Sequence, residues 1–279
     1  MTQMPQQASE RQTFFQGDAR DALRWFLDRG LRARVAYLDP PFLTGKDFGA
    51  YRDAMRREDW VELLRDVLVL CREALTEDGS LYLHIDHRTS AYARLLLDEV
   101  FGGDCFLNEI IWAYQSGGRS TRHYSRKHDT IFFYGRSGHT FFRPHLVGLP
   151  RGEARSNHMR RGVDDAGRAY SSIRTAGQEY RYYDDELVPP GDVWTDISHL
   201  QQRDPERTGY PTQKPLRLLE RVLLPSSEEG DWVIDPFCGS GTTLHAAHRL
   251  GRRGFSADIS PASLDAVRAR LGEEVTAVP

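Results

Sequence analysis

Cysteine is scarce in this sequence of 279 residues, and its scarcity narrows the kind of protein. The three cysteines, Cys71, Cys105 and Cys238, stand far apart and lack the paired spacing of metal ligands. A disulfide-stapled scaffold and a zinc-binding module are therefore excluded. We expect no metal site, and we expect three buried thiols in a core that a chain of this length forms without cross-links.

Long apolar runs are lacking as well. No stretch of about 18 consecutive apolar residues occurs, which is the length that a membrane-spanning helix needs. The first residues, Met1 to Gln7, lack the basic start and apolar centre of a secretory signal. We therefore expect a cytoplasmic protein with no membrane partner.

Lysine is also scarce, since only three of the 37 basic residues are lysine. The net charge is −3, which argues against a general nucleic-acid binder. Between positions 119 and 181, however, 13 basic residues stand beside only five acidic ones. A bias toward arginine explains the residue type but not the clustering. The cluster predicts one surface that contacts phosphates.

The motif Asp39-Pro40-Pro41-Phe42 follows an apolar run, residues 34–38, that predicts a buried strand. Asp39 would lie at the carboxyl end of that strand, where open α/β sheets bind ligands. The two prolines fix the backbone, so the carbonyls of this loop can be held rigid as acceptors. A simple strand-ending turn is the alternative interpretation.

These residue types suit the exocyclic amino group of a nucleobase, a poor nucleophile because its lone pair is delocalised into the ring. The Asp39 carboxylate and the Pro40 carbonyl can each accept one amine hydrogen, which pulls the nitrogen toward a pyramidal geometry. Phe42 can stack on the base, and such stacking contributes about 1–3 kcal/mol. That energy helps to hold a nucleotide extruded from a duplex.

A second motif, Asp235–Thr243 (DPFCGSGTT), joins an apolar strand to a helix through a turn with two glycines. Gly239 and Gly241 would let the backbone approach a ligand above the helix N-terminus, and Thr242 suits the helix cap. The next strand ends on Asp258, near the spacing at which nucleotide-binding folds place a carboxylate on ribose hydroxyls. No third glycine follows, which disfavours an NAD-dependent oxidoreductase.

The two motifs in this order resemble the beta class of S-adenosylmethionine-dependent DNA amino methyltransferases, in which the catalytic motif precedes the cofactor motif. The similarity extends from Gly17 to about Leu271 and includes, in register, residues 79–86, 106–112, 127–134 and 210–215. It implies an α/β, Rossmann-like methyltransferase fold. The sheet would be seven-stranded, mostly parallel and circularly reordered, so that the cofactor half comes last.

The resemblance also implies a role for each motif residue. Asp39, Pro40, Pro41 and Phe42 would hold the target base. Asp258 would bind the ribose of S-adenosyl-L-methionine, and Thr212 and Lys214 would lie near its methionine end. The expected cofactor-binding residues are Asp235, Phe237, Gly239, Gly241, Thr242, Asp258, Thr212 and Lys214.

Three parts of the chain follow from the resemblance and from the change in composition. They are a catalytic half (1–141), a target-recognition insertion rich in arginine and tyrosine (142–193) and a cofactor-binding half (194–279). A glycine-hinged basic loop, residues 115–128, breaks all periodicity and is expected beside the active site. The residues expected to bind DNA are Arg119, Arg122, Arg126, Lys127, Arg160 and Arg161.

The sequence leaves alternatives for the target base, the substrate and the partners. Aspartate at position 39 resembles adenine-N6 enzymes, whereas cytosine-N4 enzymes of this class more often carry serine there. We expect site-specific methylation of adenine N6 in double-stranded DNA, with base flipping, and cytosine N4 as the alternative. An RNA or protein-amide methyltransferase and a non-catalytic DNA-binding relic are further alternatives. A homodimer and a cognate restriction endonuclease are candidate partners.

Overall fold

The computed structural model describes residues 12–47, 49, 53–115, 120–152 and 158–278. The chain divides into a larger unit, residues 1–142 with 192–279, and a smaller unit, residues 143–191. The smaller unit begins and ends within two residues of the expected insertion, 142–193. Arg119 lies outside the described residues.

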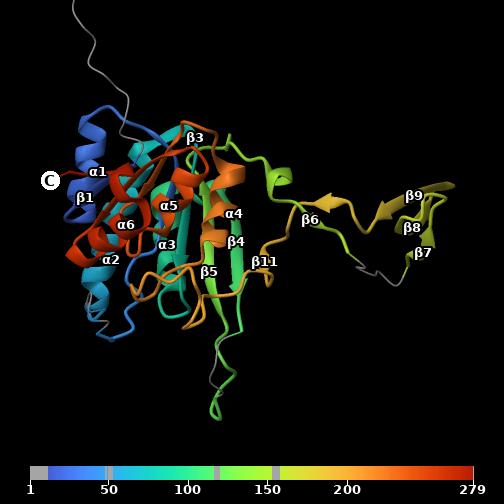
Figure 1. Cartoon of the computed structure of the whole chain (residues 1–279), viewed down its shortest axis with the longest axis horizontal. Coiled ribbons are helices and arrows are strands. Elements are labelled where there is room, and N and C mark those ends of the chain that lie inside the picture. Colours follow the sequence, from blue (N-terminus) through green and yellow to red (C-terminus); the bar gives the residue numbers. More distant parts are fainter. Residues whose placement is uncertain (1–11, 48, 50–52, 116–119, 153–157, 279) are drawn as a thin grey trace, which may run out of the picture. The chain divides into compact units, whose positions relative to one another are not determined.

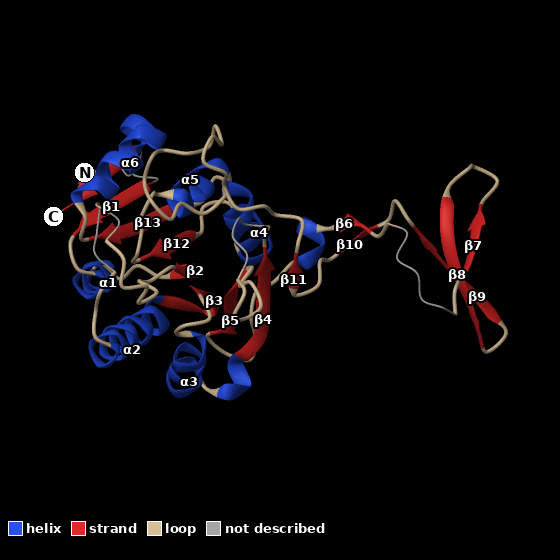
Figure 2. Ribbon diagram, turned by 90° about the horizontal axis from the view of Figure 1, so that it is seen from below, coloured by secondary structure: helices blue, strands red, loops and turns tan. Residues whose placement is uncertain are grey.

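One large sheet forms the centre of the larger unit. Its strands are β1 (Gln12–Gln16), β2 (Ala33–Leu38), β3 (Leu75–Ile85), β4 (Phe106–Ala113), β5 (His128–Gly135), β11 (Val193–Trp194), β12 (Trp232–Asp235), β13 (Arg253–Asp258) and β14 (Val275–Val278). Their order in the sheet is β11-β4-β5-β3-β2-β12-β13-β1-β14. Figure 1 labels the neighbouring strands β4 and β5, and Figure 2 shows all of these strands but β14 labelled in this order. Of these strands, only β5 runs antiparallel to its neighbours, β3 and β4.

The sheet has nine strands where we expected seven. The sheet ends in a short strand at each edge, β11 on β4 and β14 on β1. β11 has only two residues and β14 only four, too few for a hydrophobic period to stand out in the sequence. The mostly parallel α/β architecture itself is as expected.

Six described α-helices cover the sheet, three on each face (Figure 2). One face carries α1 (Ala19–Asp28), α2 (Arg57–Ala74) and α3 (Ser90–Phe101); the other carries α4 (Leu216–Ser226), α5 (Thr242–Arg249) and α6 (Pro261–Leu271). Three short 3₁₀ helices complete the set: η1 (Gly103–Cys105), η2 (Pro144–Val147) and η3 (Gly272–Glu274).

The apolar run in β2 explains these layers, because successive residues of a strand point to opposite faces. Ala36 and Leu38 belong to the core beneath α1, α2 and α3. Val35 and Tyr37 belong to the core beneath α4 and α5. A strand buried on both faces has no polar side, which is why the run reads as continuously apolar.

The thiols are not all buried as expected. Cys71 and Cys238 are buried, but Cys105 is half-buried in η1, where a short turn at the end of the sheet leaves one side open. In the described part of the chain, no helix combines the length and apolar character needed to cross a membrane.

The smaller unit contains two small antiparallel sheets. β6 (Leu149–Pro150) pairs with β10 (Leu187–Val188). β7 (Arg160–Val163), β8 (Ala169–Thr175) and β9 (Gln178–Tyr183) form a three-stranded meander. The residues of β7, β8 and β9 are mostly exposed or half-buried, so the sequence of this unit lacks the apolar pattern of buried strands.

Candidate active site

The two sequence motifs meet because the strands that precede them are neighbours. β2 and β12 pair in parallel, with Val35 opposite Val233 and Ala36 opposite Ile234. Asp39 follows β2 and Asp235 ends β12, so both carboxylates lie at the same edge of the sheet. We call residues 39–44 the proline loop and residues 235–243 the glycine turn.

A cavity of about 290 Å³ lies between the proline loop and the glycine turn. Most of the predicted site residues line it, whereas Pro40, Phe42 and Gly241 are not among its lining residues. The predicted residues in the lining are Asp39, Pro41, Thr212, Lys214, Asp235, Phe237, Gly239, Thr242 and Asp258.

Backbone hydrogen bonds hold the glycine turn to the strand beside it. Both carboxylate oxygens of Asp258 accept backbone N–H groups, one from Gly239 and one from Ser260, each at 2.8 Å. The carbonyl of Gly239 accepts the Ser263 hydroxyl at 2.6 Å. The backbone N–H of Phe237 donates to Asp235 at 3.0 Å. The turn is therefore rigid before any ligand contact is considered.

The two glycines of the turn have different tasks. Gly239 has a φ of +54°, lines the cavity, and a Cβ there would meet nothing closer than 3.7 Å. Gly241 has a φ of +76°, and a Cβ there would lie 2.6 Å from Val267 Cγ2 of α6. We expected both glycines to give a ligand access. Gly241 instead lets α5 begin against α6.

The segment before α4 reaches the cavity from a third direction. Thr242, expected as a helix cap, makes no capping bond; its hydroxyl donates to the Lys214 carbonyl at 3.2 Å. Thr212 has a φ of +59°, which for a β-branched residue is a strained conformation. Such strain persists only where the surrounding structure imposes it, and it is common at ligand sites.

Negative charge dominates the cavity. The pKa of Asp235 is raised to about 7, chiefly by burial and also by the nearby carboxylates of Asp39 and Asp258, against hydrogen bonds from Thr243 and the Phe237 N–H. Burial also raises the pKa of Asp258. These shifts indicate a site prepared for a cation, which would favour the ionised carboxylates.

Lys214 is the cation that the chain itself brings to this cavity. Its Nζ lies 2.5 Å from Asp39 Oδ2, and the two side chains are only 11% and 19% exposed. The same Nζ lies 5.1 Å from the centroid of the Phe42 ring. Lys214 thus orients the carboxylate and contacts the aromatic ring of the proline loop.

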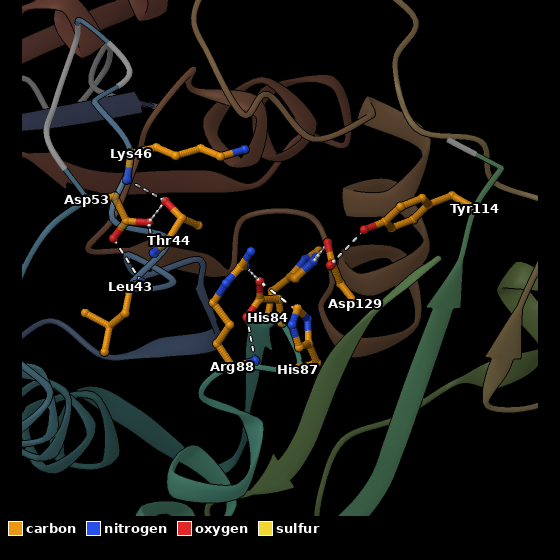
Figure 3. A network of polar contacts seen from close by, with 10 residues as sticks. Leu43, Thr44, Lys46, Asp53, His84, His87, Arg88, Tyr114 and Asp129 are labelled. Atoms are coloured by element: carbon orange, nitrogen blue, oxygen red, sulfur yellow. Dashed lines mark hydrogen bonds and ion pairs between the residues drawn. The ribbon is translucent and has the colours of Figure 1, made fainter. Parts of the chain in front are cut away.

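Residues from elsewhere hold the proline loop in place. The Trp60 indole donates to the Pro41 carbonyl at 2.7 Å. Asp53, which is buried, accepts the backbone N–H groups of Leu43 and Thr44 and the Thr44 hydroxyl, at 3.0, 2.9 and 2.7 Å (Figure 3). Leu43 has a φ of +56°, so Asp53 stabilises a strained backbone. These bonds anchor the described part of the connection that follows the proline loop.

Three residues near the site were missed in the sequence. Asp18 caps α1 and lines the cavity. Its position in the Gly17-Asp18 pair, where the family similarity begins, was the feature of the sequence that could have indicated it. Tyr37 lines the cavity from β2, and His84 lies buried beside Phe42. A histidine within an apolar strand was the available signal for the last.

The residues expected to bind DNA fall into two groups. Arg122 and Arg126 are exposed on the basic loop, and Lys127 is half-buried at its end. Arg161 instead makes a two-point ion pair with Asp184, at 2.5 and 2.6 Å, within the smaller unit. That unit contains eight arginines and seven acidic residues, so the positive excess belongs to the basic loop. The cluster that we counted ended just before Asp184, Asp185 and Glu186.

Among the described side chains, no group of three histidine, cysteine, aspartate or glutamate residues is placed to hold a metal ion.

The chain is similar in sequence to known proteins. A family model described as DNA methylase, for N6 and N4 methyltransferases, matches residues 33–268. The type II methyltransferase M.EcaI of Enterobacter cloacae is 29% identical over 89% of this chain. The DNA adenine methyltransferase YhdJ of Escherichia coli (strain K12) is 27% identical over 90% of this chain and 80% of its own length.

The fold is shared with solved structures too. The crystal structure of the M1.HpyAVI-SAM complex matches with a TM-score of 0.60 at 18% identity, covering 94% of this chain and 99% of the other. The chain spans about two thirds of the length of M.EcaI, since the match covers 66% of that relative.

Proposed function

This chain belongs to the DNA methylase family of N6 and N4 amino methyltransferases, and we propose that it transfers a methyl group from S-adenosyl-L-methionine to adenine N6 in double-stranded DNA. One observation carries the proposal. The proline loop and the glycine turn, 196 positions apart at Asp39 and Asp235, line one cavity from adjacent parallel strands.

The cavity suits the charge of S-adenosylmethionine. The cofactor carries a cationic sulfonium and an ammonium group, and the cavity offers the carboxylates of Asp235 and Asp258. Lys214, which lines the same cavity, would bind the cofactor carboxylate. Gly239 presents backbone without a side chain, so the turn can be approached closely. When bound, the cofactor supplies an electrophilic methyl group.

Asp39 and the Pro40 carbonyl would accept the two hydrogens of the target amine. Lys214 fixes one oxygen of Asp39, and a carboxylate has about four acceptor positions, so acceptor capacity remains for the base. Phe42 would stack on the base after it leaves the duplex. The remaining cofactor contacts that we propose are Phe237, Thr242 and Thr212, with Asp258 on the ribose hydroxyls.

Adenine is favoured over cytosine by the residue at position 39 and by one relative. YhdJ is named a DNA adenine methyltransferase, and its similarity spans 90% of this chain. Cytosine N4 presents the same two hydrogens to the same acceptors, so the geometry of the proline loop accommodates either base.

The basic loop is the proposed contact with DNA phosphates. Arg122, Arg126 and Lys127 concentrate charge there, with Arg119 and Arg160 as further candidates. Arg126→Ala should reduce the salt dependence of DNA affinity by about one counterion. Arg161→Ala is the matched control, because its ion pair with Asp184 predicts a loss of stability instead. An equal salt slope in both variants would contradict this assignment.

The cell context follows from the same proposal. M.EcaI is named a type II methyltransferase, so a cognate restriction endonuclease is a proposed partner in the cytoplasm, where the DNA substrate lies. Gel filtration would test the homodimer that we also propose.

Nucleoside mass spectrometry tests the reaction. Purified protein is incubated with S-adenosylmethionine and unmethylated genomic DNA, which is then digested. We expect N6-methyladenine. N4-methylcytosine would keep the mechanism and overturn the target base, and neither product in the presence of bound cofactor would overturn the DNA substrate.

A further inference from the structure

A chain of four polar side chains crosses the sheet beneath the proline loop. Tyr37, His84, Asp129 and Tyr114 come from β2, β3, β5 and the residue after β4, which are consecutive neighbours in the sheet. The Tyr37 hydroxyl lies 2.7 Å from His84 Nδ1, and His84 Nε2 lies 3.1 Å from Asp129 Oδ2. The Tyr114 hydroxyl donates to Asp129 Oδ1 at 3.0 Å (Figure 3).

The charge of Asp129 determines which atoms donate and which accept in these hydrogen bonds. Burial raises the pKa of Asp129, but hydrogen bonds from His84 and Tyr114 and the charge of Lys214 outweigh burial and lower it. The ionised Asp129 accepts a hydrogen bond from the N–H group at Nε2 of His84. The other ring nitrogen, Nδ1, then accepts the Tyr37 hydroxyl. A fully buried imidazole with both nitrogens bonded cannot rotate without losing both bonds.

His84 contacts the proline loop through its ring face. The His84 and Phe42 rings stack with centroids 6.1 Å apart and planes 29° from parallel. The Trp112 ring meets the imidazole edge-on at 5.6 Å. Phe42 therefore packs against an imidazole ring whose plane is fixed by Tyr37, Asp129 and Trp112.

We propose that His84 is a positioning residue that holds the Phe42 ring in the plane needed to receive the target base, an inference that rests on the proposed function. Phe42 lies on a loop, and its ring is only partly buried. An aromatic plate is useful for stacking only if its plane is constant. A hydrogen-bonded imidazole fixes that plane better than an aliphatic side chain, because both ring nitrogens are tied to neighbouring strands.

The test compares His84→Ala with Tyr82→Phe. Tyr82 lies two residues earlier on the same strand, is equally buried, and bonds Ser226 instead of reaching the proline loop. We measure thermal unfolding, cofactor affinity by calorimetry, and kcat and KM on an oligonucleotide carrying the site mapped in genomic DNA. The same oligonucleotide with 2-aminopurine at the target position reports base stacking by fluorescence.

His84→Ala should lower kcat/KM for DNA by about 10- to 100-fold, the range of one lost base-stacking contact. The bound 2-aminopurine should be brighter than in the wild type, because it is less stacked, and cofactor affinity should stay close to wild type. Asp129→Asn and Tyr114→Phe keep the core volume and should shift the same readouts in the same direction by less. They also keep the inference testable if His84→Ala does not fold.

Failure of the positioning role of His84 can be distinguished from failure of the proposed function. A wild-type protein that methylates DNA, with His84, Asp129 and Tyr114 variants that match Tyr82→Phe in fluorescence and kcat/KM, overturns the positioning role. A wild-type protein that gives no methylated base overturns the proposed function itself.

Discussion

The glycine turn and the proline loop follow neighbouring strands and line one cavity, yet they are held by different means. The glycine turn is fixed by groups within about one βαβ unit: Asp235, the Asp258 carboxylate and the Ser263 hydroxyl. The proline loop is fixed by Trp60, Asp53, His84 and Lys214, the last of which is 175 positions from Asp39.

The glycine turn depends on groups of one βαβ unit, whereas the proline loop depends also on His84 and Lys214, which folding brings from other elements. The glycine turn should therefore fail through its own backbone. The proline loop should fail also through side chains, such as those of Asp53 and His84, to which we assign no contact with cofactor or base. Each of the following changes tests one side of that difference.

The largest effect is expected from Asp39→Ala, which removes the carboxylate acceptor for the amine. Methyl transfer should fall by about 10²- to 10³-fold or more, as for other preorganised polar groups in active sites. Cofactor affinity should stay close to wild type, because the glycine turn is held independently. Labelled-methyl transfer and calorimetry measure the two. Asp47→Ala, exposed in the same connection, is the control, and full activity of Asp39→Ala would rule out the mechanism.

Gly241→Ala should destabilise the glycine turn. The new methyl group meets Val267, and the left-handed backbone adds strain, so the free energy of unfolding should fall by about 2–4 kcal/mol. Gly239→Ala meets nothing within 3.7 Å and should lose only the smaller backbone contribution. Urea unfolding compares them. Equal losses would contradict the packing role of Gly241.

Asp53→Ala should loosen the proline loop without touching the glycine turn. Three hydrogen bonds to Leu43 and Thr44 disappear, and about 1–3 kcal/mol of local stability goes with them. Activity on DNA should fall while cofactor affinity stays, and Asp53→Asn should recover part of the loss. A parallel drop in cofactor affinity would show that the two loops are not held separately.

The smallest effect concerns pH. The pKa of Asp235 is about 7 in the folded protein against 3.8 as a free group, so the folded state retains a proton that the unfolded state loses. Raising the pH from about 4 to 7 therefore lowers the free energy of unfolding through this group, by a few kcal/mol at most. Asp235→Asn should flatten that slope in urea unfolding at about pH 5 and about pH 8. An unchanged slope would contradict the raised pKa.

Cofactor affinity should rise over the same pH interval, since a bound cation favours the ionised Asp235. Calorimetry on the wild type measures this rise, and Asp235→Asn should lack it.

The glycine turn shows how far a sequence can be interpreted. Its strand, turn, helix and following acid are contiguous, and Asp235, Phe237, Gly239, Thr242 and Asp258 all line the cavity. Gly241 and the cap of α5 differed, because contact with Val267 and the bond from Thr242 to the Lys214 carbonyl depend on other elements. The edge strands β11 and β14 were not predicted, because they are too short to show a hydrophobic period in the sequence.

The order of the motifs, the apolar run of β2 and the glycine spacing determined by themselves the α/β class, the family resemblance and the two loops of the site. These features are local, and local backbone geometry depends on nearby residues. Only the tertiary structure decided what supports the proline loop. His84 and Lys214 act across distances in sequence at which no period or spacing connects them to the loop, because folding alone brings their elements together. It also decided which arginines are paired within the smaller unit, since Arg161 meets Asp184 only when β7 folds against its neighbours.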